Sequence, residues 1–478
     1  MTFPSERPTQ VRYSMIALTT LVAIMLYLDR VCLGILNAEI RPALELTSKE
    51  YGRLLSAFFW AYAIFQLPAG WLGDRYGPRS ILAIYLFLWS LCTGLMGLAT
   101  GFGTFLILRL GCGMFEAGAY PLAAGIVRRW MPLRSRGLAS GCVSVGGRLG
   151  GAIAPALTVW LASGSVDGWR RPFMVYGVVG MIGAVIFWAW FRNRPSEHPA
   201  VNPAEADLIN SGNVVLETNR VGLPPFRAMI ASRALWMSSF VQMMSNFVWV
   251  FLITLMPTYL DEAFNIPVKE RANLQSIPLY AGIFGMLLGG WLTDLAAKRF
   301  GMRWGRALPI AGSRLIVGGA YLACVGLHDP IAVIVLLAVV AMSTDMGVAP
   351  VWAFGQDVGG RHVGAIVGWA NMWGNFGAAL GTEILLGVRS LYSYEPTSGW
   401  TSDSIARKIS EGLNPFVDLG VDASKFGGAF AASDFSAGWG MAFLVCAGSQ
   451  LLAAIAALGI DASKPIQHRE ETRESQTR

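Results

Sequence analysis

Long apolar stretches, separated by short polar connections, follow one another along almost the whole chain. Each is about 20 residues or longer, which is the length that an α-helix needs to cross a bilayer. Inside a bilayer the backbone must satisfy its own hydrogen bonds, so such stretches form helices. The pattern predicts an all-α integral membrane protein with twelve transmembrane helices, at residues 13–36, 51–73, 80–100, 103–127, 138–162, 171–192, 234–260, 274–296, 306–326, 331–355, 363–387 and 435–460.

A polar segment rich in Pro, Asn and Glu, residues 193–233, separates the sixth predicted helix from the seventh. We therefore expect an N-terminal six-helix bundle at 1–192, a linker at 193–233, a C-terminal six-helix bundle at 234–460 and a tail at 461–478. The eleventh connection, about 388–434, is far longer than ordinary loops. It is either a flexible insertion or a lid or partner site.

Composition and charge agree with a multi-pass membrane protein. The chain is 54% hydrophobic and 14% charged, whereas soluble domains carry about 25% charged residues. The net charge of +7 does not indicate a nucleic-acid partner, because the basic residues lie mostly in the connections between apolar stretches. They are concentrated in the even-numbered connections, and the positive-inside rule therefore places both termini and the linker in the cytoplasm and the insertion outside. We expect a monomer in the cell (inner) membrane, surrounded by lipid.

Motifs of enzymes are missing from the sequence. The six cysteines lie in apolar stretches, without the spacing of metal ligands. There is no nucleotide-binding loop and no nucleophile with a base beside it. We expect no cofactor, no metal and no enzyme activity. The N-terminus has no pattern of a cleavable signal, so the first helix is expected to be retained.

Two sequence segments indicate that the halves are copies of one unit. Gly70-Trp71-Leu72-Gly73-Asp74 closes the second predicted helix, and Gly290-Trp291-Leu292-Thr293-Asp294 closes the eighth. Arg75 follows the first segment directly. Asp74, Arg75 and Asp294 are candidate gating residues. Asp74 and Arg75 could bond to the eleventh predicted helix or to the loop after the fourth and hold the outward-open state, and Asp294 could do the same in the second half. Solvation of the helix ends is the alternative.

A positive and a negative charge lie inside the fourth predicted helix. Arg109 and Glu116 are seven residues apart, so both project from the same helical face. A charge at the bilayer centre costs about 2.5–3.5 kcal/mol on insertion scales, and such residues mark transport pathways by default. A buried ion pair that only locks helices together is the alternative.

Several of these segments resemble a known family. Gly70-Trp71-Leu72-Gly73-Asp74-Arg75-Tyr76-Gly77-Pro78-Arg79 resembles the loop signature of the major facilitator superfamily. Within it, Tyr27-Leu28-Asp29-Arg30, Arg109 with Glu116, and Met256-Pro257-Thr258-Tyr259-Leu260 resemble the anion:cation symporter family, which includes bacterial sugar-acid carriers and vesicular glutamate and sialic-acid transporters. The resemblance implies the major facilitator fold.

The resemblance also implies roles for single residues. Arg30 would bind the substrate carboxylate, for which its planar guanidinium is suited. Asp29 and Glu116 would be proton sites, and Arg109 would adjust them by pairing with one or the other in one state. Capping or anchoring of the first helix is the alternative for Asp29 and Arg30. Candidate groups for substrate hydroxyls are Tyr27, Tyr62, Asn246, Asn371 and Asn375, although each could instead make an interhelical hydrogen bond.

Arg148 departs from the family pattern, because it places a further cation midway along the fifth predicted helix. It is either a second anion contact, which would suggest a dianionic substrate, or the partner of an acid such as Asp345 in the tenth.

Together these features predict a secondary active transporter that takes up an organic anion, a sugar acid such as a hexonate, hexuronate or aldarate, with protons by alternating access. A proton-coupled drug or metabolite exporter of the same superfamily is the first alternative, and a membrane enzyme or receptor on a transporter-like scaffold is the second. The sequence leaves open the identity of the anion, sodium in place of protons, and the direction of transport.

Overall fold

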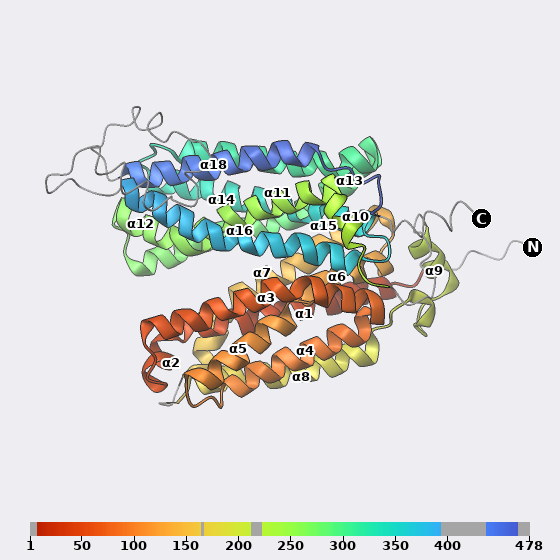
Figure 1. Cartoon of the computed structure of the whole chain (residues 1–478), viewed down its shortest axis with the longest axis horizontal. Helices are drawn as coiled ribbons and strands as arrows, with labels where there is room; N and C mark the ends of the chain where they lie inside the picture. Colours follow the sequence, from red (N-terminus) through yellow and green to blue (C-terminus); the bar gives the residue numbers. More distant parts are fainter. Residues whose placement is uncertain (1–6, 164–166, 212–221, 393–435, 467–478) are drawn as a thin grey trace, which may run out of the picture.

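The computed structural model describes residues 7–163, 167–211, 222–392 and 436–466, and all of its regular elements in these ranges are helices. Among these described residues, ten helical stretches are long and apolar enough to cross a membrane. The helices form two bundles that lie side by side (Figure 1). We call α1–α8 the N-terminal half and α11–α18 the C-terminal half.

The N-terminal half contains the first six predicted helices, with two short additions. Its long helices are α1 (Val11–Ile35), α3 (Ser48–Tyr76), α4 (Pro78–Met96), α7 (Arg136–Ala162) and α8 (Arg170–Trp190). The fourth predicted helix is divided after Glu116 into α5 (Phe102–Glu116) and α6 (Ala119–Trp130). The short α2 (Asn37–Ala43) and the 3₁₀ turn Leu133–Ser135 were not predicted.

The C-terminal half follows the same plan. The seventh predicted helix consists of α11 (Arg233–Val250), a π-helical turn (Phe251–Leu255) and α12 (Met256–Phe264). The tenth is divided at Gly347 into α14 (Pro330–Met346) and α15 (Val348–Val358), while α18 (Ser436–Leu458) is the last. The eleventh, α16 (Val363–Tyr392), extends beyond the predicted end at residue 387. Residues 393–435, nearly all of the predicted insertion, lie outside the described residues.

Two of the predicted helices are joined in α13 (Val268–Cys324). Gly301 interrupts this element with a φ of 75°, a conformation that glycine adopts without the steric cost of a side chain. The eighth and ninth predicted helices therefore meet at Gly301 almost without a loop. The count of twelve membrane crossings stays a prediction.

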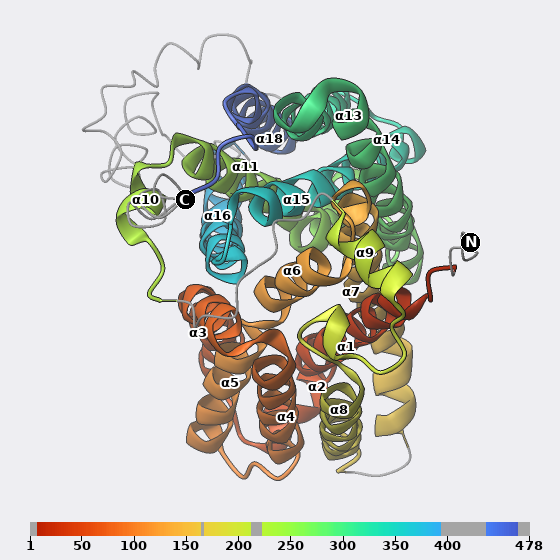
Figure 2. The ribbon, with the colours of Figure 1, turned by 90° about the vertical axis from the view of Figure 1, so that its right-hand side faces the viewer.

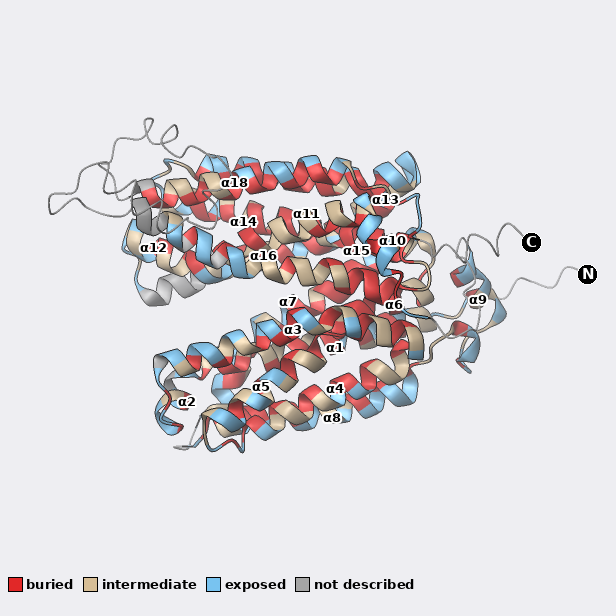
Figure 3. Cartoon of the chain, viewed as in Figure 1, coloured by how far each residue is buried: buried red, intermediate tan, exposed pale blue. Residues whose placement is uncertain are grey.

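The two halves touch at the end that carries both termini, which we call the terminal end. Toward α2 and α12, at the opposite end, the two bundles diverge (Figure 1). Seen from the terminal end, α6 and α7 of one half face α15 and α16 of the other (Figure 2). A cluster of buried side chains joins the halves here, including Val143 and Met131 on one side and Trp352 and Val367 on the other. Burial is densest along this contact (Figure 3).

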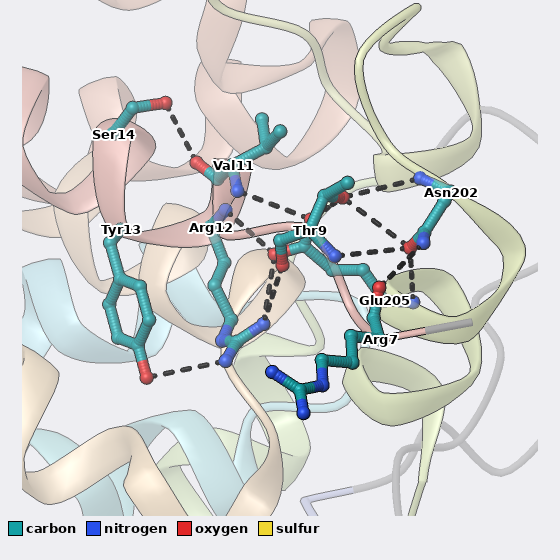
Figure 4. A network of polar contacts seen from close by, with 8 residues as sticks. All are labelled: Arg7, Thr9, Val11, Arg12, Tyr13, Ser14, Asn202 and Glu205. Carbon is teal, nitrogen blue, oxygen red and sulfur yellow. Dashed lines mark hydrogen bonds and ion pairs between the residues drawn. The ribbon is translucent and has the colours of Figure 1, made fainter. Parts of the chain in front are cut away.

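The linker packs on the start of α1. Its helix α9 (Pro203–Asn210) carries Glu205, which is fully buried. The carboxylate accepts hydrogen bonds from Val11 N at 3.2 Å and Arg12 N at 3.1 Å, and pairs with the Arg12 guanidinium at 2.9 Å (Figure 4). A carboxylate at a helix N-terminus satisfies backbone donors that have no partner in the helix. Glu205 therefore ties the linker to the N-terminal half. Short elements complete the linker: the turn Pro195–Glu197 and α10 (Phe226–Ala231).

Candidate functional site

The first charged cluster joins α1 to α5. One terminal nitrogen of Arg30 lies 3.2 Å from a carboxylate oxygen of Glu116, whose side chain is fully buried. The Arg30 side chain is 16% exposed. A buried charge without a partner is strongly unfavourable, so each of these two groups needs the other. Arg30 uses one N–H in this pair, and its Nε has no hydrogen-bond partner among the described residues.

Aromatic rings hold the guanidinium of Arg30 in place. Its central carbon lies 4.5 Å from the ring centre of Tyr62, 5.0 Å from that of Phe58 and 5.2 Å from that of Tyr27. Rings attract a cation through their negative faces and leave its edge available for hydrogen bonds. The structure thus brings the predicted residues Arg30, Tyr27 and Tyr62 together, with Phe58 as a partner that sequence reasoning missed.

Arg109 also packs on Phe58, with 4.4 Å between its guanidinium carbon and the ring centre. Arg109 is buried. Within the described ranges it makes no ion pair, so the expected pairing with Asp29 or Glu116 is not present in this state; Arg30 takes Glu116 instead. Phe58 therefore contacts the guanidinium groups of both Arg30 and Arg109.

Asp29 and Arg30 point to different helices, as neighbours on a helix must. Asp29 is buried and accepts a hydrogen bond from the indole N–H of Trp89 on α4, at 3.0 Å. Among the described residues it has no arginine within ion-pair distance. Trp89 is a second partner that the sequence did not single out.

The second charged cluster joins the two halves. Arg148 of α7 donates two hydrogen bonds to the carboxylate of Asp345 on α14, from Nε at 3.0 Å and from a terminal nitrogen at 2.7 Å. The guanidinium lies 3.7 Å from the ring centre of Trp249 on α11. The pairing of Arg148 with Asp345, one of the two alternatives from the sequence, is therefore present in this state.

The predicted asparagines gather where α11 packs on α16. The side-chain amide of Asn375 donates to the backbone carbonyl of Asn371 at 2.8 Å. The Asn246 amide faces Gly374, where an added Cβ would lie 2.8 Å from it. In the part of the chain that the structure describes, no hydrogen bond joins these three residues to Arg30 or Arg148. They form a polar group on the C-terminal half.

The candidate gating acids occupy equivalent places in the two halves. Asp74 accepts hydrogen bonds from Gly364 N and Ala365 N at the start of α16, each at 2.9 Å. Asp294 accepts from Gly137 N and Leu138 N at the start of α7, each at 3.0 Å. Each acid thus caps a helix of the opposite half. Arg75 stays on its own half, beside the rings of Trp71 and Tyr76.

Asp357 is a further link between the halves that sequence reasoning missed. Its carboxylate lies 3.0 Å from a terminal nitrogen of Arg136 in the N-terminal half and 2.8 Å from Nε of Arg306 in its own half. In the sequence, Arg136 and Arg306 served only as basic residues of the connections, from which the topology was inferred. An acid at the end of an otherwise apolar stretch was the available signal.

A second missed signal is a short repeat. In each copy of the repeat an acidic residue is followed by Gly two positions later and by Pro five positions later. The two copies are Glu116-Ala117-Gly118-Ala119-Tyr120-Pro121 and Asp345-Met346-Gly347-Val348-Ala349-Pro350. In each half the helix breaks beside that glycine, and the acid before it binds an arginine of the N-terminal half. Glu116 and Asp345 are therefore counterparts. The described residues contain no cluster of potential metal ligands.

Comparisons with known proteins agree on the kind of protein. Residues 19–382 match the family model of the Major Facilitator Superfamily. The chain is 30% identical to a probable sulfoacetate transporter of Cupriavidus necator, over 77% of this chain and 84% of that one. It is 32% identical to a probable L-galactonate transporter of Escherichia coli, over 66% and 68%. A probable galactarate/D-glucarate transporter of Bacillus subtilis is 31% identical, over 80% and 87%.

Solved structures with the same fold are also transporters. The superfamily member FucP, described in the outward conformation, superposes with a TM-score of 0.63 at 14% identity and covers 92% of this chain and 97% of its own. The proton:xylose symporter XylE superposes with a TM-score of 0.60 at 13% identity, over 93% and 94%. At these identities the likeness concerns the fold.

Proposed function

This chain belongs to the Major Facilitator Superfamily and is similar to its anion:cation symporters, and from that premise we propose that it takes up an organic anion together with protons. The anion we propose is a sugar acid, such as a hexonate, hexuronate or aldarate. The relatives named above support this class, since two of them are named as sugar-acid transporters.

The ion pair between Arg30 and Glu116 carries the proposal. A fixed cation with unused N–H groups is suited to a carboxylate, which accepts two parallel hydrogen bonds from a guanidinium. The fully buried Glu116 must be either paired or neutral. A substrate carboxylate that takes Arg30 would therefore leave Glu116 to bind a proton. Linkage makes the effect mutual, so that proton binding also favours substrate binding.

Asp29 and Arg109 would complete the coupling. Asp29 is buried beside Trp89 with no cation in contact among the described residues, so it is a second candidate for proton uptake. Arg109, which also packs on Phe58, would hold Glu116 when Arg30 is occupied by substrate. The polar groups of Tyr27, Tyr62, Asn246, Asn371 and Asn375 would bind the hydroxyls, and Arg148 a second acidic group.

The contacts at the terminal end would form the inner gate. With both termini in the cytoplasm of the cell (inner) membrane, as the loop charges favour, the closed end faces inward and this state is open outward. Asp74 and Asp294 then have to release α16 and α7 when the halves rock about the midplane. We infer a monomer with bundles at 1–192 and 234–460, in which each half moves as one unit.

An uptake assay tests the proposal. The purified protein is reconstituted in liposomes with an acidic outside, and labelled galactonate, glucuronate and galactarate are each offered. Accumulation above the outside concentration, abolished by a protonophore, is expected for at least one of them. Equal levels inside and outside for every acid in the series would contradict coupled uptake. Efflux against the gradient would favour an exporter.

A further inference from the structure

Arg148 and Asp345 form the outermost of a row of contacts between the halves along α7. At the terminal end Asp294 caps α7 at Gly137 and Leu138. One turn further, Gly141 lies against the backbone carbonyl of Met286, since an added Cβ would lie 2.7 Å from that oxygen. Arg148 and Asp345 follow two turns beyond Gly141. The pair therefore lies where the halves begin to diverge, on the side from which substrate would enter.

Tyr27 connects the two arginines of the N-terminal half. Arg30 lies 5.2 Å from the centre of its ring. The ring also packs on α7, where a Cβ added to Gly147 would lie 2.7 Å from Cε2 of Tyr27. Gly147 directly precedes Arg148 in the chain. Arg148 also lies close enough to Tyr27 to interact with it electrostatically, so Tyr27 is near both guanidinium groups and a single small molecule could touch both.

Asp345 binds Arg148 as a substrate carboxylate would. Both carboxylate oxygens of Asp345 accept from the same guanidinium, and Arg148 retains 12% exposure of its side chain. Arg30 and Arg148 are each occupied by an acid of the chain itself, and the two acids are counterparts in the repeat. The empty carrier therefore keeps both cations neutralised.

Asp345 has a second cation close by. Arg314 of α13 is buried and donates to the backbone carbonyl of Thr344, the residue before Asp345, at 2.8 Å. Its other hydrogen bonds go to neutral groups, Ser245 at 2.7 Å and Gln450 at 3.4 Å, and its Nε has no partner among the described residues. When Arg148 is taken by another anion, Asp345 can turn to Arg314 without becoming an isolated buried charge.

We propose that Asp345 occupies the binding site of a second acidic group of the substrate on Arg148, and that this carrier therefore selects substrates with two acidic groups. The inference rests on the proposed function, because one acidic group binds Arg30. The other displaces Asp345 from Arg148. A substrate with a single acidic group leaves the Arg148–Asp345 pair intact and so gains only one of the two contacts. The substrate class is a dicarboxylate, or a molecule with one carboxylate and one sulfonate.

Calorimetric titration of the purified protein tests this with matched pairs of ligands, galactarate against galactonate and sulfoacetate against acetate. Each pair differs by one acidic group. A charge-assisted hydrogen bond is worth about 1.5–3 kcal/mol, so the member with two acidic groups is expected to bind about tenfold to a hundredfold more tightly. Equal affinities within both pairs would overturn the inference.

Three variants separate substrate selection from a structural role. R148Q/D345N removes both charges of the pair and leaves Arg314 with the hydrogen bonds it already makes, so it is expected to fold, to keep its affinity for the singly acidic ligands and to lose the preference. D345N alone should bind the doubly acidic ligands more tightly, because their competitor is gone. A preference that survives in the double variant, or weaker binding of every ligand by D345N, would contradict the inference.

R30Q distinguishes this inference from the proposed function. This variant should bind both ligands of each pair more weakly than the wild type does, and by the same factor. If wild-type protein binds neither member of either pair and does not bind glucuronate, the proposed function itself fails, and the inference fails with it. If both members bind equally and R30Q weakens both, the proposed function stands and only the selection of doubly acidic substrates is refuted.

Discussion

Arg30 and Glu116 are 86 residues apart in the chain, and their charged groups lie 3.2 Å apart inside the N-terminal half. The carboxylate is fully buried, whereas the guanidinium keeps some exposure. A substrate anion can therefore reach the cation of this pair before it reaches the acid. This order of access would let substrate binding release Glu116 to a proton.

Substitution of Glu116 by Gln should uncouple transport from the proton gradient. The amide keeps the size of the side chain and can still accept a hydrogen bond from Arg30, but it cannot titrate. We expect exchange of labelled for unlabelled substrate across liposomes to persist while accumulation driven by a pH gradient is lost. Glu116→Asp, which retains a titratable group, should retain part of the accumulation. Accumulation by E116Q at the wild-type level would rule out this role.

Substitution of Gly70 by Ala should open the terminal end. An added Cβ at Gly70 would overlap the backbone carbonyl of Gly364 in the other half, and backbone cannot move aside as a side chain can. The partly buried Cys142 packs on the cluster that joins the halves. We expect G70A to raise the rate of maleimide labelling at Cys142 several-fold, as measured by peptide mass spectrometry.

Gly125→Ala is the matched control for Gly70→Ala. Gly125 also lies in a helix of the N-terminal half, but an added Cβ would meet nothing within 4 Å. Its labelling rate should equal that of the wild type. If the G70A and G125A variants label alike, the close approach of α3 and α16 does not keep this end closed.

Substitution of Glu205 by Gln should loosen the linker from α1. The buried carboxylate of Glu205 bonds to Arg12 and two backbone N–H groups, and breaking a buried pair costs about 3–5 kcal/mol. Glu197→Gln is the control, because its pair with Arg194 is 3.8 Å long and half exposed, a kind worth about 0–1 kcal/mol. A lower Tm and faster proteolysis of the linker are expected for E205Q alone. Equal Tm values for the two variants would contradict the structural role.

His198 in the linker should make the protein less stable in acid. Burial between Trp130 and Trp190, and the nearby Arg192, lower the pKa of His198 below its ordinary value. The imidazole of His198 then binds a proton more readily in the unfolded chain than in the folded one. The contribution of neutral His198 to the free energy of unfolding is therefore fully present above about pH 6.5 and is lost as the pH falls toward the lowered pKa. Between pH 7.5 and 5.5 the Tm of H198Q should fall less than that of the wild type. An equal fall would exclude His198 as the cause.

Much of the fold was predictable because lipid restricts the backbone to helices. The apolar stretches gave most helix ends to within a few residues, and the duplicated segment gave the two equivalent caps made by Asp74 and Asp294. The breaks beside Gly118 and Gly347 and the junction at Gly301 were not predicted. Such features depend on how helices pack, which hydropathy does not encode.

The charged residues of the site were predictable, but not all of their partners. A charge in an apolar stretch is expensive, so Arg30, Glu116 and Arg148 stand out in the sequence. Which acid meets which arginine depends on the rotation of each helix about its own axis. In this state Glu116 pairs with Arg30, and the pairing of Arg109 with Glu116 or Asp29 in another state stays a prediction. Phe58 and Trp89 carried no signal, because aromatic residues are ordinary in membrane helices.

Simultaneous measurement of proton and anion movement tests the central claim most directly. Liposomes that contain the purified protein and a trapped pH-sensitive dye are given a pulse of galactarate or galactonate, with no pH gradient imposed and the membrane potential clamped. The account predicts acidification of the interior that begins with anion entry, and that is absent in the E116Q variant. Anion entry with no acidification in the wild type would contradict proton-coupled uptake through the Arg30–Glu116 pair.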